Sequence, residues 1–171
     1  MTLTRLISYV VLSSVLILQS CKVNYSFTGA SVSPAVKTIS IATFPANQTP
    51  LAPPNLSQDF TESLKDIFLR QTSLALVKNN GDLLIEGEIT GYRQKDEAVA
   101  GNDQSTISRL TITVKVRYTD TKDEKNSYEQ SFSNFEQFDG TKTLAEVEES
   151  LIESINEKLA QDIFNRSLGN W

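Results

Sequence analysis

The chain contains no histidine and a single cysteine, Cys21. The absence of histidine excludes a Ser-His-Asp or Cys-His nucleophile system, and it leaves no set of cysteine and histidine ligands for a zinc site of the usual kind. One cysteine also excludes a disulfide within the chain. Any catalysis would have to depend on carboxylates, lysine or tyrosine, and no motif indicates a metal or an organic cofactor.

Basic residues are also fewer than acidic ones. The 171 residues include 16 lysines and arginines against 21 aspartates and glutamates, which gives a formal net charge of -5. Proteins that bind nucleic acid present a basic face, because each neutralised phosphate releases counterions. The charge balance therefore argues against a nucleic acid partner, and an anionic ligand of another kind would need a local patch of basic side chains.

The N-terminal residues have the organisation of a secretion signal. Arg5 precedes the apolar run Leu6–Leu18, which matches the charged and hydrophobic regions of such a signal. The run is shorter than the roughly 20 apolar residues that a membrane-spanning helix needs. The next residues, Gln19-Ser20-Cys21, resemble a bacterial lipobox, in which a small residue precedes a cysteine that receives lipid and becomes the mature N-terminus.

We therefore predict that Cys21 is the site of lipid attachment. Each buried methylene of an acyl chain adds about 0.8 kcal/mol of membrane affinity, so a multiply acylated cysteine would hold the protein firmly on a bilayer. The alternative is an ordinary free cysteine near the end of a signal. The expected organisation is a lipoprotein signal peptide over residues 1–20, a lipid-anchored tether over residues 21–35 and a single domain over residues 36–171.

Two segments have the apolar period of an amphipathic helix. The first is predicted to begin at Asn55 and the second at Thr143, each with a glutamine or glutamate three residues later that would complete a capping box. Apolar residues recur at steps of mainly three and four, so each helix should bury one face. These residues are Leu56, Phe60, Leu64, Ile67 and Phe68 in the first helix and Leu144, Val147, Leu151, Ile155, Leu159 and Ile163 in the second.

Alternation and turn residues predict five strands, and residues 95–105 between two of them are expected to form a long, mobile hairpin loop. The strands cover residues 36–44, 74–77, 83–93, 109–118 and 127–135. In the third strand, one register holds Ile85, Gly87, Ile89 and Gly91, and the other holds Glu86, Glu88, Thr90 and Tyr92. Phe135 and Phe138 are expected to pack in the interior.

The order of elements is one strand, a helix, four strands and a second helix. A strand, a helix and a strand joined by short links predict a crossover that makes the two strands parallel. Two helices with one apolar face each and a sheet with one apolar face predict an α+β fold, a two-layer sandwich of one mixed β-sheet with both helices packed on the same face. The opposite sheet face would meet solvent or a partner.

Cations gather on the polar register of the strand over residues 109–118, where threonines separate them. They are Arg109, Lys115 and Arg117, and Arg93 and Lys95 lie at the end of the adjacent strand. Such a stripe is suited to binding phosphate or carboxylate groups, with the threonine hydroxyls donating further hydrogen bonds. The alternative is a soluble outer face whose charge is balanced by Glu86 and Glu88.

Glu86 and Glu88 are also candidates for acid-base chemistry. They lie two residues apart on one strand face, so their carboxyls would be about 7 Å apart, within the range that glycoside hydrolysis uses. On an antiparallel hairpin, however, they would lie near Lys115 and Arg117, and opposite charges across strands are common on exposed sheets. The second interpretation is favoured, since a hydrolase would also require a deep pocket between the two acids.

Several stretches in collinear order carry a family resemblance that covers the mature chain. They are Tyr25–Ser31 after the lipobox, Lys37–Ile41, Phe44-Pro45, Leu56–Asp66, Glu86–Tyr92, Arg109–Val116 and Asp162–Asn165, with Asn-Trp at the end of the chain. Together they resemble the LptE family of lipopolysaccharide-assembly lipoproteins, in the form found in Bacteroidetes-type bacteria. None of these stretches is a catalytic signature. The resemblance is specific because all of them occur together in the same order.

The resemblance implies a non-enzymatic outer-membrane lipoprotein that sits as a plug in a large β-barrel partner, LptD, and forms with it the heterodimeric lipopolysaccharide translocon. It also implies a sheet with two helices on one side, assistance to barrel folding, and contact with lipopolysaccharide. In these bacteria an acidic run after the cysteine resembles a surface-export signal. The residues Lys22–Tyr25 contain no such run, so the protein is expected to face the periplasm.

The five cations Arg93, Lys95, Arg109, Lys115 and Arg117 are accordingly the candidate lipopolysaccharide-contacting residues. Two other functions remain open. One is a lipid-anchored periplasmic binding or scaffold module of another envelope complex. The other, less favoured, is a carboxylate-dependent hydrolase that uses Glu86 and Glu88.

Overall fold

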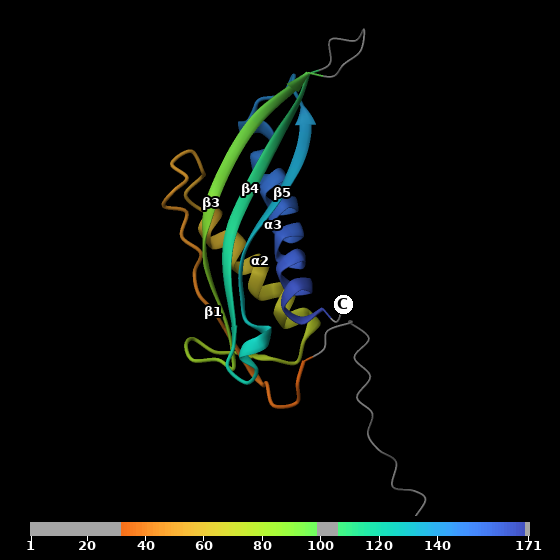
Figure 1. The fold of residues 1–171 in the computed structure, drawn as a ribbon. Helices are drawn as coiled ribbons and strands as arrows, with labels where there is room; N and C mark the ends of the chain where they lie inside the picture. The colour runs from red at the N-terminus through yellow and green to blue at the C-terminus, as the bar shows by residue number, and fades with distance from the viewer. Residues whose placement is uncertain (1–31, 99–105, 170–171) are drawn as a thin grey trace, which may run out of the picture.

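The computed structural model describes residues 32–98 and 106–169. Within these residues the chain forms one five-stranded mixed sheet and two α-helices, which lie behind the sheet in Figure 1. The elements are β1 (Thr38–Ile41), α2 (Leu56–Gln71), β2 (Ala75–Leu76), β3 (Leu83–Ala98), β4 (Thr106–Asp120), the 3-10 helix η1 (Glu124–Asn126), β5 (Tyr128–Asp139) and α3 (Leu144–Leu168). The predicted α+β fold and element order are confirmed.

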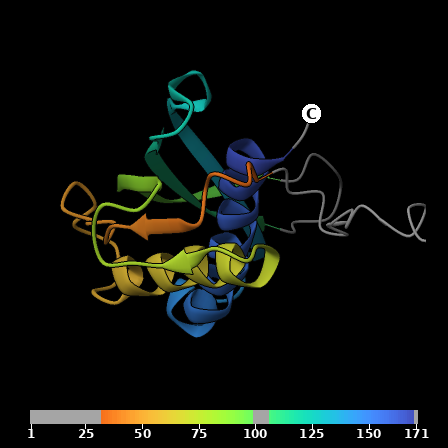
Figure 2. The same ribbon diagram turned by 90° about the horizontal axis from the view of Figure 1, so that it is seen from below.

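The sheet has the strand order β2-β1-β3-β4-β5. β1 pairs in parallel with both β2 and β3, whereas β3, β4 and β5 form an antiparallel meander. The predicted parallel pairing of the strands on either side of α2 is therefore confirmed. Figure 1 shows the three long strands curving in front of α3, and Figure 2 gives the view from below, in which α2 lies alongside β1.

The two helices bury their apolar stripes against the inner face of the sheet. Every stripe residue predicted for α2 is buried, as are Leu151, Ile155, Leu159 and Ile163 of α3. Burial of each such side chain stabilises the fold by about 1.5–3 kcal/mol. Two edge-to-face ring pairs contribute to this core. The centroids of Phe44, which follows β1, and Phe60 of α2 are 5.0 Å apart, and those of Phe68 of α2 and Phe164 of α3 are 5.1 Å apart. Leu144 and Val147 are only partly buried at the margin of this core.

The two predicted capping boxes have different outcomes. At α3 the box is present, and the Thr143 backbone N–H donates to the Glu146 carboxylate at 2.7 Å. At α2 the prediction is wrong, because Asn55 has α-helical backbone angles and its side chain forms no cap hydrogen bond. The Asn55 amide instead donates along the helix to the Asp59 carboxylate at 2.7 Å. A residue already in the helical conformation cannot turn its side chain back over the first-turn amides.

The predicted alternation of β3 is wrong beyond Ile89, because the strand contains a β-bulge there. Ile89 pairs with Val114 and Gly91 with Thr113, so Thr90 is an extra residue. Because side chains alternate between faces, one inserted residue exchanges the faces for every residue that follows. Tyr92 therefore points towards the helices, where its hydroxyl donates to the Glu148 carboxylate of α3.

The predicted loop over residues 95–105 is also wrong in extent. The β3–β4 ladder continues to the pair Ala98 and Thr106, so residues 95–98 of the predicted loop belong to β3, and residues 99–105 lie outside the described part of the chain. Polar pairs hold this end of the ladder together, since the Ser108 hydroxyl donates to the Asp96 carboxylate at 2.6 Å. Polarity had indicated a loop, but an antiparallel hairpin tolerates polar residues on both faces once it extends beyond the core.

Gly87 marks a close approach within the sheet layer. A Cβ atom at this position would lie 2.1 Å from the Lys115 carbonyl oxygen and 2.5 Å from a ring carbon of Phe44. The glycine therefore makes room for the ring of Phe44, the residue that follows β1.

Candidate functional site

The sheet face opposite the helices is lined by polar and charged side chains of β3, β4 and β5. Residues directly paired across strands share a face, and the register pairs Lys95 with Arg109 and Arg93 with Thr111. The same register pairs Glu88 with Lys115 and Glu86 with Arg117. The structure thus brings all five candidate cations onto this open sheet face, and the bulge at Thr90 is what places Arg93 and Lys95 there.

The cations form two groups rather than one stripe. Arg93, Lys95 and Arg109 form a distal basic cluster near the β3–β4 hairpin end. Lys115 lies about 20 Å further along β4, six residues after Arg109, and Arg117 lies beyond it. These two, with Glu86, Glu88 and Glu129, form the proximal charged cluster.

The proximal charged cluster is neutralised internally. Lys115 Nζ lies 2.6 Å from the Glu129 carboxylate, and Arg117 donates to the same carboxylate through Nε at 3.0 Å and Nη2 at 2.9 Å. These hydrogen bonds hold the pKa of the Glu129 carboxyl below its usual range. Glu129 was missed by the sequence reasoning, which had assigned the balancing role to Glu86 and Glu88. Its position in an alternating strand was visible, but its cross-strand partners depend on the β4–β5 register.

Glu86 and Glu88 line a concavity of about 270 Å³ that opens on this sheet face between Pro45 and the Lys115 and Arg117 side chains. Glu88 accepts a hydrogen bond from the Gln48 amide at 3.0 Å. The two acids thus lie opposite cations on a surface, which is the arrangement of cross-strand charge pairs. It differs from the deep pocket that the hydrolase hypothesis requires.

The distal basic cluster has a different environment. Its two cross-strand rows are Arg93, Thr111 and Phe135, and Lys95, Arg109 and Gln137, and neither contains a carboxylate. The next row contains two acids, Glu97 of β3 and Asp139 of β5. Asp139 accepts hydrogen bonds from the Thr141 backbone N–H at 2.9 Å and hydroxyl at 2.8 Å. The two rows of the distal basic cluster themselves carry three cations and no acid.

An aromatic ring adjoins this cluster. The Arg109 guanidinium carbon lies 4.2 Å from the centroid of Phe135, and Phe135 is 44% exposed. The expectation that Phe135 packs in the interior is wrong, because it belongs to the outward register of β5, whereas Phe132 and Phe138 point inward and are buried. Together the cations and the ring offer charge and apolar surface side by side, which suits an anionic amphiphile.

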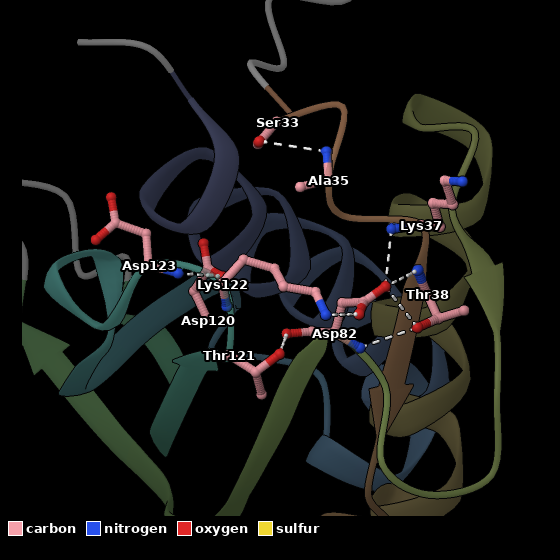
Figure 3. A network of polar contacts seen from close by, with 9 residues as sticks. All are labelled: Ser33, Ala35, Lys37, Thr38, Asp82, Asp120, Thr121, Lys122 and Asp123. Carbon is pink, nitrogen blue, oxygen red and sulfur yellow. Dashed lines mark hydrogen bonds and ion pairs between the residues drawn. The ribbon is translucent and has the colours of Figure 1, made fainter.

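A second polar network lies at the opposite end of the sheet and is structural (Figure 3). The Asp82 carboxylate accepts hydrogen bonds from the backbone N–H groups of Lys37 at 2.9 Å and Thr38 at 3.0 Å, and it pairs with Lys122 Nζ at 2.8 Å. The Lys122 contact and these backbone donors hold the pKa of Asp82 far below its usual range. Asp82 thereby joins the starts of β1 and β3 to the turn between β4 and β5.

Some sequence-based expectations lie outside the described residues, among them the signal peptide and Cys21. Among the residues that the structure describes, no three acidic, cysteine or histidine side chains converge as metal ligands. Neither described helix combines the length and the apolar character that crossing a membrane requires.

Structural comparison supports the fold. A minor lipoprotein from Acinetobacter baumannii superposes with a TM-score of 0.50 at 17% identity, over 77% of this chain and 92% of that one. A hypothetical protein from Chlamydia trachomatis superposes with a TM-score of 0.53 at 13% identity, over 79% of this chain and 99% of that one. At these identities the likeness concerns the fold alone.

Sequence comparison supplies the family. No curated protein sequence matches the chain. The family LptE, described as lipopolysaccharide-assembly, matches residues 36–167, which include every strand and nearly all of both helices. The chain belongs to the LptE lipopolysaccharide-assembly family.

Proposed function

We propose that this protein is an outer-membrane lipoprotein that joins an LptD-like β-barrel and acts as the plug and assembly subunit of the translocon that inserts lipopolysaccharide into the outer membrane. In this proposal Cys21 carries the lipid, residues 1–20 are removed, residues 21–35 form the tether, and residues 36–171 form one domain that faces the periplasm. The role is non-enzymatic. Membership of the family supports a part in lipopolysaccharide assembly.

The observation that carries the proposal is the open sheet face. A plug must present a hydrophilic surface to the polar interior of a barrel, and this face carries charged residues, threonines and serines on three long strands. The helices, by contrast, use their apolar stripes for the core of the domain. The open face is therefore the surface that we assign to the barrel.

The distal basic cluster is the part of this face that we assign to lipopolysaccharide. Clustered phosphates on the sugar core would pair with Arg93, Lys95 and Arg109, and the exposed Phe135 ring would pack against apolar atoms of the same ligand. Lys115 and Arg117 contribute less in this account, because Glu129 already occupies them. Among the five candidate lipopolysaccharide-contacting residues, those of the distal basic cluster therefore rank above Lys115 and Arg117.

Co-purification from membranes tests the proposal. The full chain with an affinity tag at its C-terminus should be extracted from the outer membrane with a large β-barrel protein in about equal amounts. The Cys21→Ala variant should lose its lipid and move to the soluble periplasmic fraction. Recovery of the wild-type protein without a barrel would contradict the proposal, and recovery with another envelope assembly would favour the scaffold alternative.

A further inference from the structure

The junction of α2 and α3 carries a groove that the proposed function does not use. Two concavities, of about 550 Å³ and about 480 Å³, share Ser63 of α2 and Glu153 of α3 in their walls. The larger one lies between the residues that lead into α2 and the first half of α3. Its volume is within the range of about 300–1,000 Å³ that is usual for ligand sites.

The larger concavity is lined by four carboxylates and, among the described residues, by no cation. The carboxylates belong to Asp59, Glu148, Glu149 and Glu153. Asp59 accepts a hydrogen bond from Asn55, and Glu148 accepts one from Tyr92, so two of the four have neutral donors. None of the four forms an ion pair with another residue in the described ranges. Their charge is therefore available to a cationic ligand.

A buried carboxamide lines the same concavity. Asn156 is only 1% exposed, and neither its Oδ1 nor its Nδ2 has a hydrogen-bond partner within residues 32–98 and 106–169. Burying a carboxamide without partners is unfavourable, because both groups lose their hydrogen bonds to water. Its neighbours one turn away, Ile152 and Leu159, are apolar, so a leucine would satisfy the packing at this position. The donor and the acceptor of Asn156 are thus left for a ligand.

We propose that the larger concavity of this groove binds an extended, positively charged segment of a protein partner; the smaller one is lined also by Arg70 and Lys158. The Asn156 carboxamide would donate to the carbonyl and accept from the N–H of the bound backbone. The surrounding carboxylates would pair with lysine or arginine side chains of the segment. The groove shares no residue with the open sheet face, so the partner held here would leave that face accessible.

The chemistry of the groove favours a peptide over smaller cations. A divalent metal needs several converging oxygen ligands, and no such group is present among the described residues. A polyamine would pair with the carboxylates and donate to Asn156 Oδ1, but it has no acceptor for Nδ2. A peptide supplies both partners together with the positive charge.

Fluorescence anisotropy with the full chain tests this proposal. The probes are a labelled eight-residue peptide of alternating lysine and serine and its counterpart of alternating glutamate and serine. We expect the lysine peptide to bind at least about tenfold more tightly than the glutamate peptide, because charge complementarity sets the preference. Unlabelled lysine peptide should displace the probe at a concentration at least about fivefold lower than spermine, since spermine cannot accept from Asn156.

Two variants assign the binding to the groove. Asn156→Leu should lower the affinity for the lysine peptide at least about fivefold. The Tm of this variant should equal or exceed that of the wild type, because an unsatisfied buried carboxamide is removed. Glu149→Gln/Glu153→Gln should lower the affinity for the lysine peptide and make that affinity less dependent on salt concentration. The latter pair is exposed on α3, so it tests the groove even if Asn156→Leu fails to fold. The matched control, Glu62→Gln/Glu124→Gln, removes two exposed carboxylates outside the groove and should bind as the wild type does.

Four outcomes would overturn the proposal. Two concern the ligands: equal affinity for the lysine and glutamate peptides, and displacement by spermine as effective as displacement by the lysine peptide. Two concern the variants: equal weakening of peptide binding by the groove pair and the control pair, and unchanged affinity in a folded Asn156→Leu variant. None of these results bears on the barrel, because the experiment uses neither barrel nor lipopolysaccharide.

Discussion

Arg109 of β4 and Phe135 of β5 lie together on the open sheet face, with the guanidinium carbon 4.2 Å from the centroid of the ring. The contact holds an arginine beside an exposed aromatic side chain, and the cross-strand rows of these two residues contain no carboxylate. It contrasts with Arg117, whose guanidinium donates twice to Glu129. The two arginines of β4 therefore have different neighbours, an aromatic ring beside Arg109 and a carboxylate beside Arg117.

This difference predicts unequal effects on lipopolysaccharide binding. The variant Arg93→Gln/Lys95→Gln/Arg109→Gln should weaken binding at least about tenfold, because each charge-assisted hydrogen bond to phosphate contributes about 1.5–3 kcal/mol before solvent screening. Titration with fluorescent lipopolysaccharide measures the affinity. The control Lys115→Gln/Arg117→Gln should weaken binding less than about threefold, since its cations already pair with Glu129. Equal losses in both variants would contradict the ranking.

Gly87 should not tolerate a side chain. Gly87→Ala would place a Cβ atom 2.1 Å from the Lys115 carbonyl oxygen and 2.5 Å from the Phe44 ring. We expect a loss of about 1–3 kcal/mol in the free energy of unfolding, the usual effect of overpacking, measured by urea denaturation. Gly91→Ala is the matched control on the same strand, where the nearest atom would be at 3.1 Å. A larger loss at Gly91 than at Gly87 would refute this account of the strand.

The pair Tyr92 and Glu148 should couple the sheet to α3. Removing the hydroxyl in Tyr92→Phe should lower the free energy of unfolding by about 1 kcal/mol, because the hydrogen bond is made to a carboxylate in a half-buried position. The burial and this hydrogen bond also raise the pKa of Tyr92 well above its usual value. A double-mutant cycle with Glu148→Gln measures the coupling, and additive effects would show that the two side chains do not interact.

Asp82 should make the free energy of unfolding depend on pH in the acidic range. Its pKa is depressed in the folded protein, so its stabilising effect is complete above the unfolded value of about 3.9 and is lost as the pH falls towards the folded value. Urea unfolding should therefore show wild type more stable than Asp82→Asn at pH 7, with the difference shrinking below about pH 4. A difference that grows on acidification would have the wrong sign.

The sequence predicted the elements well because their signals are local. The stripe of α2 and the alternation of β4 fix which side chains are buried, and these follow directly from residue spacing. The same reasoning failed at Thr90, where one extra residue reverses the faces of Tyr92, Arg93 and Lys95. A bulge depends on the partner strand, which spacing within one strand does not specify.

The candidate site was predictable as a set of residues but not as an arrangement. The five cations were visible as polar positions on two strands. The neutralisation of Lys115 and Arg117 depends on Glu129, whose pairing with them follows from the β4–β5 register. The exposed ring of Phe135 was likewise assigned to the interior, because an aromatic residue in a strand usually faces the core.

Photocrosslinking in living cells tests the central claim most directly. A photoreactive amino acid in place of Ser131, which is exposed on β5 beside Lys115 on the open sheet face, should capture a large outer-membrane β-barrel protein. Substitution at Gln137, beside the distal basic cluster, should in addition capture lipopolysaccharide. Both products should disappear when Cys21→Ala releases the protein from the membrane. Absence of any barrel product from Ser131 in the lipidated protein would contradict the assignment of this face.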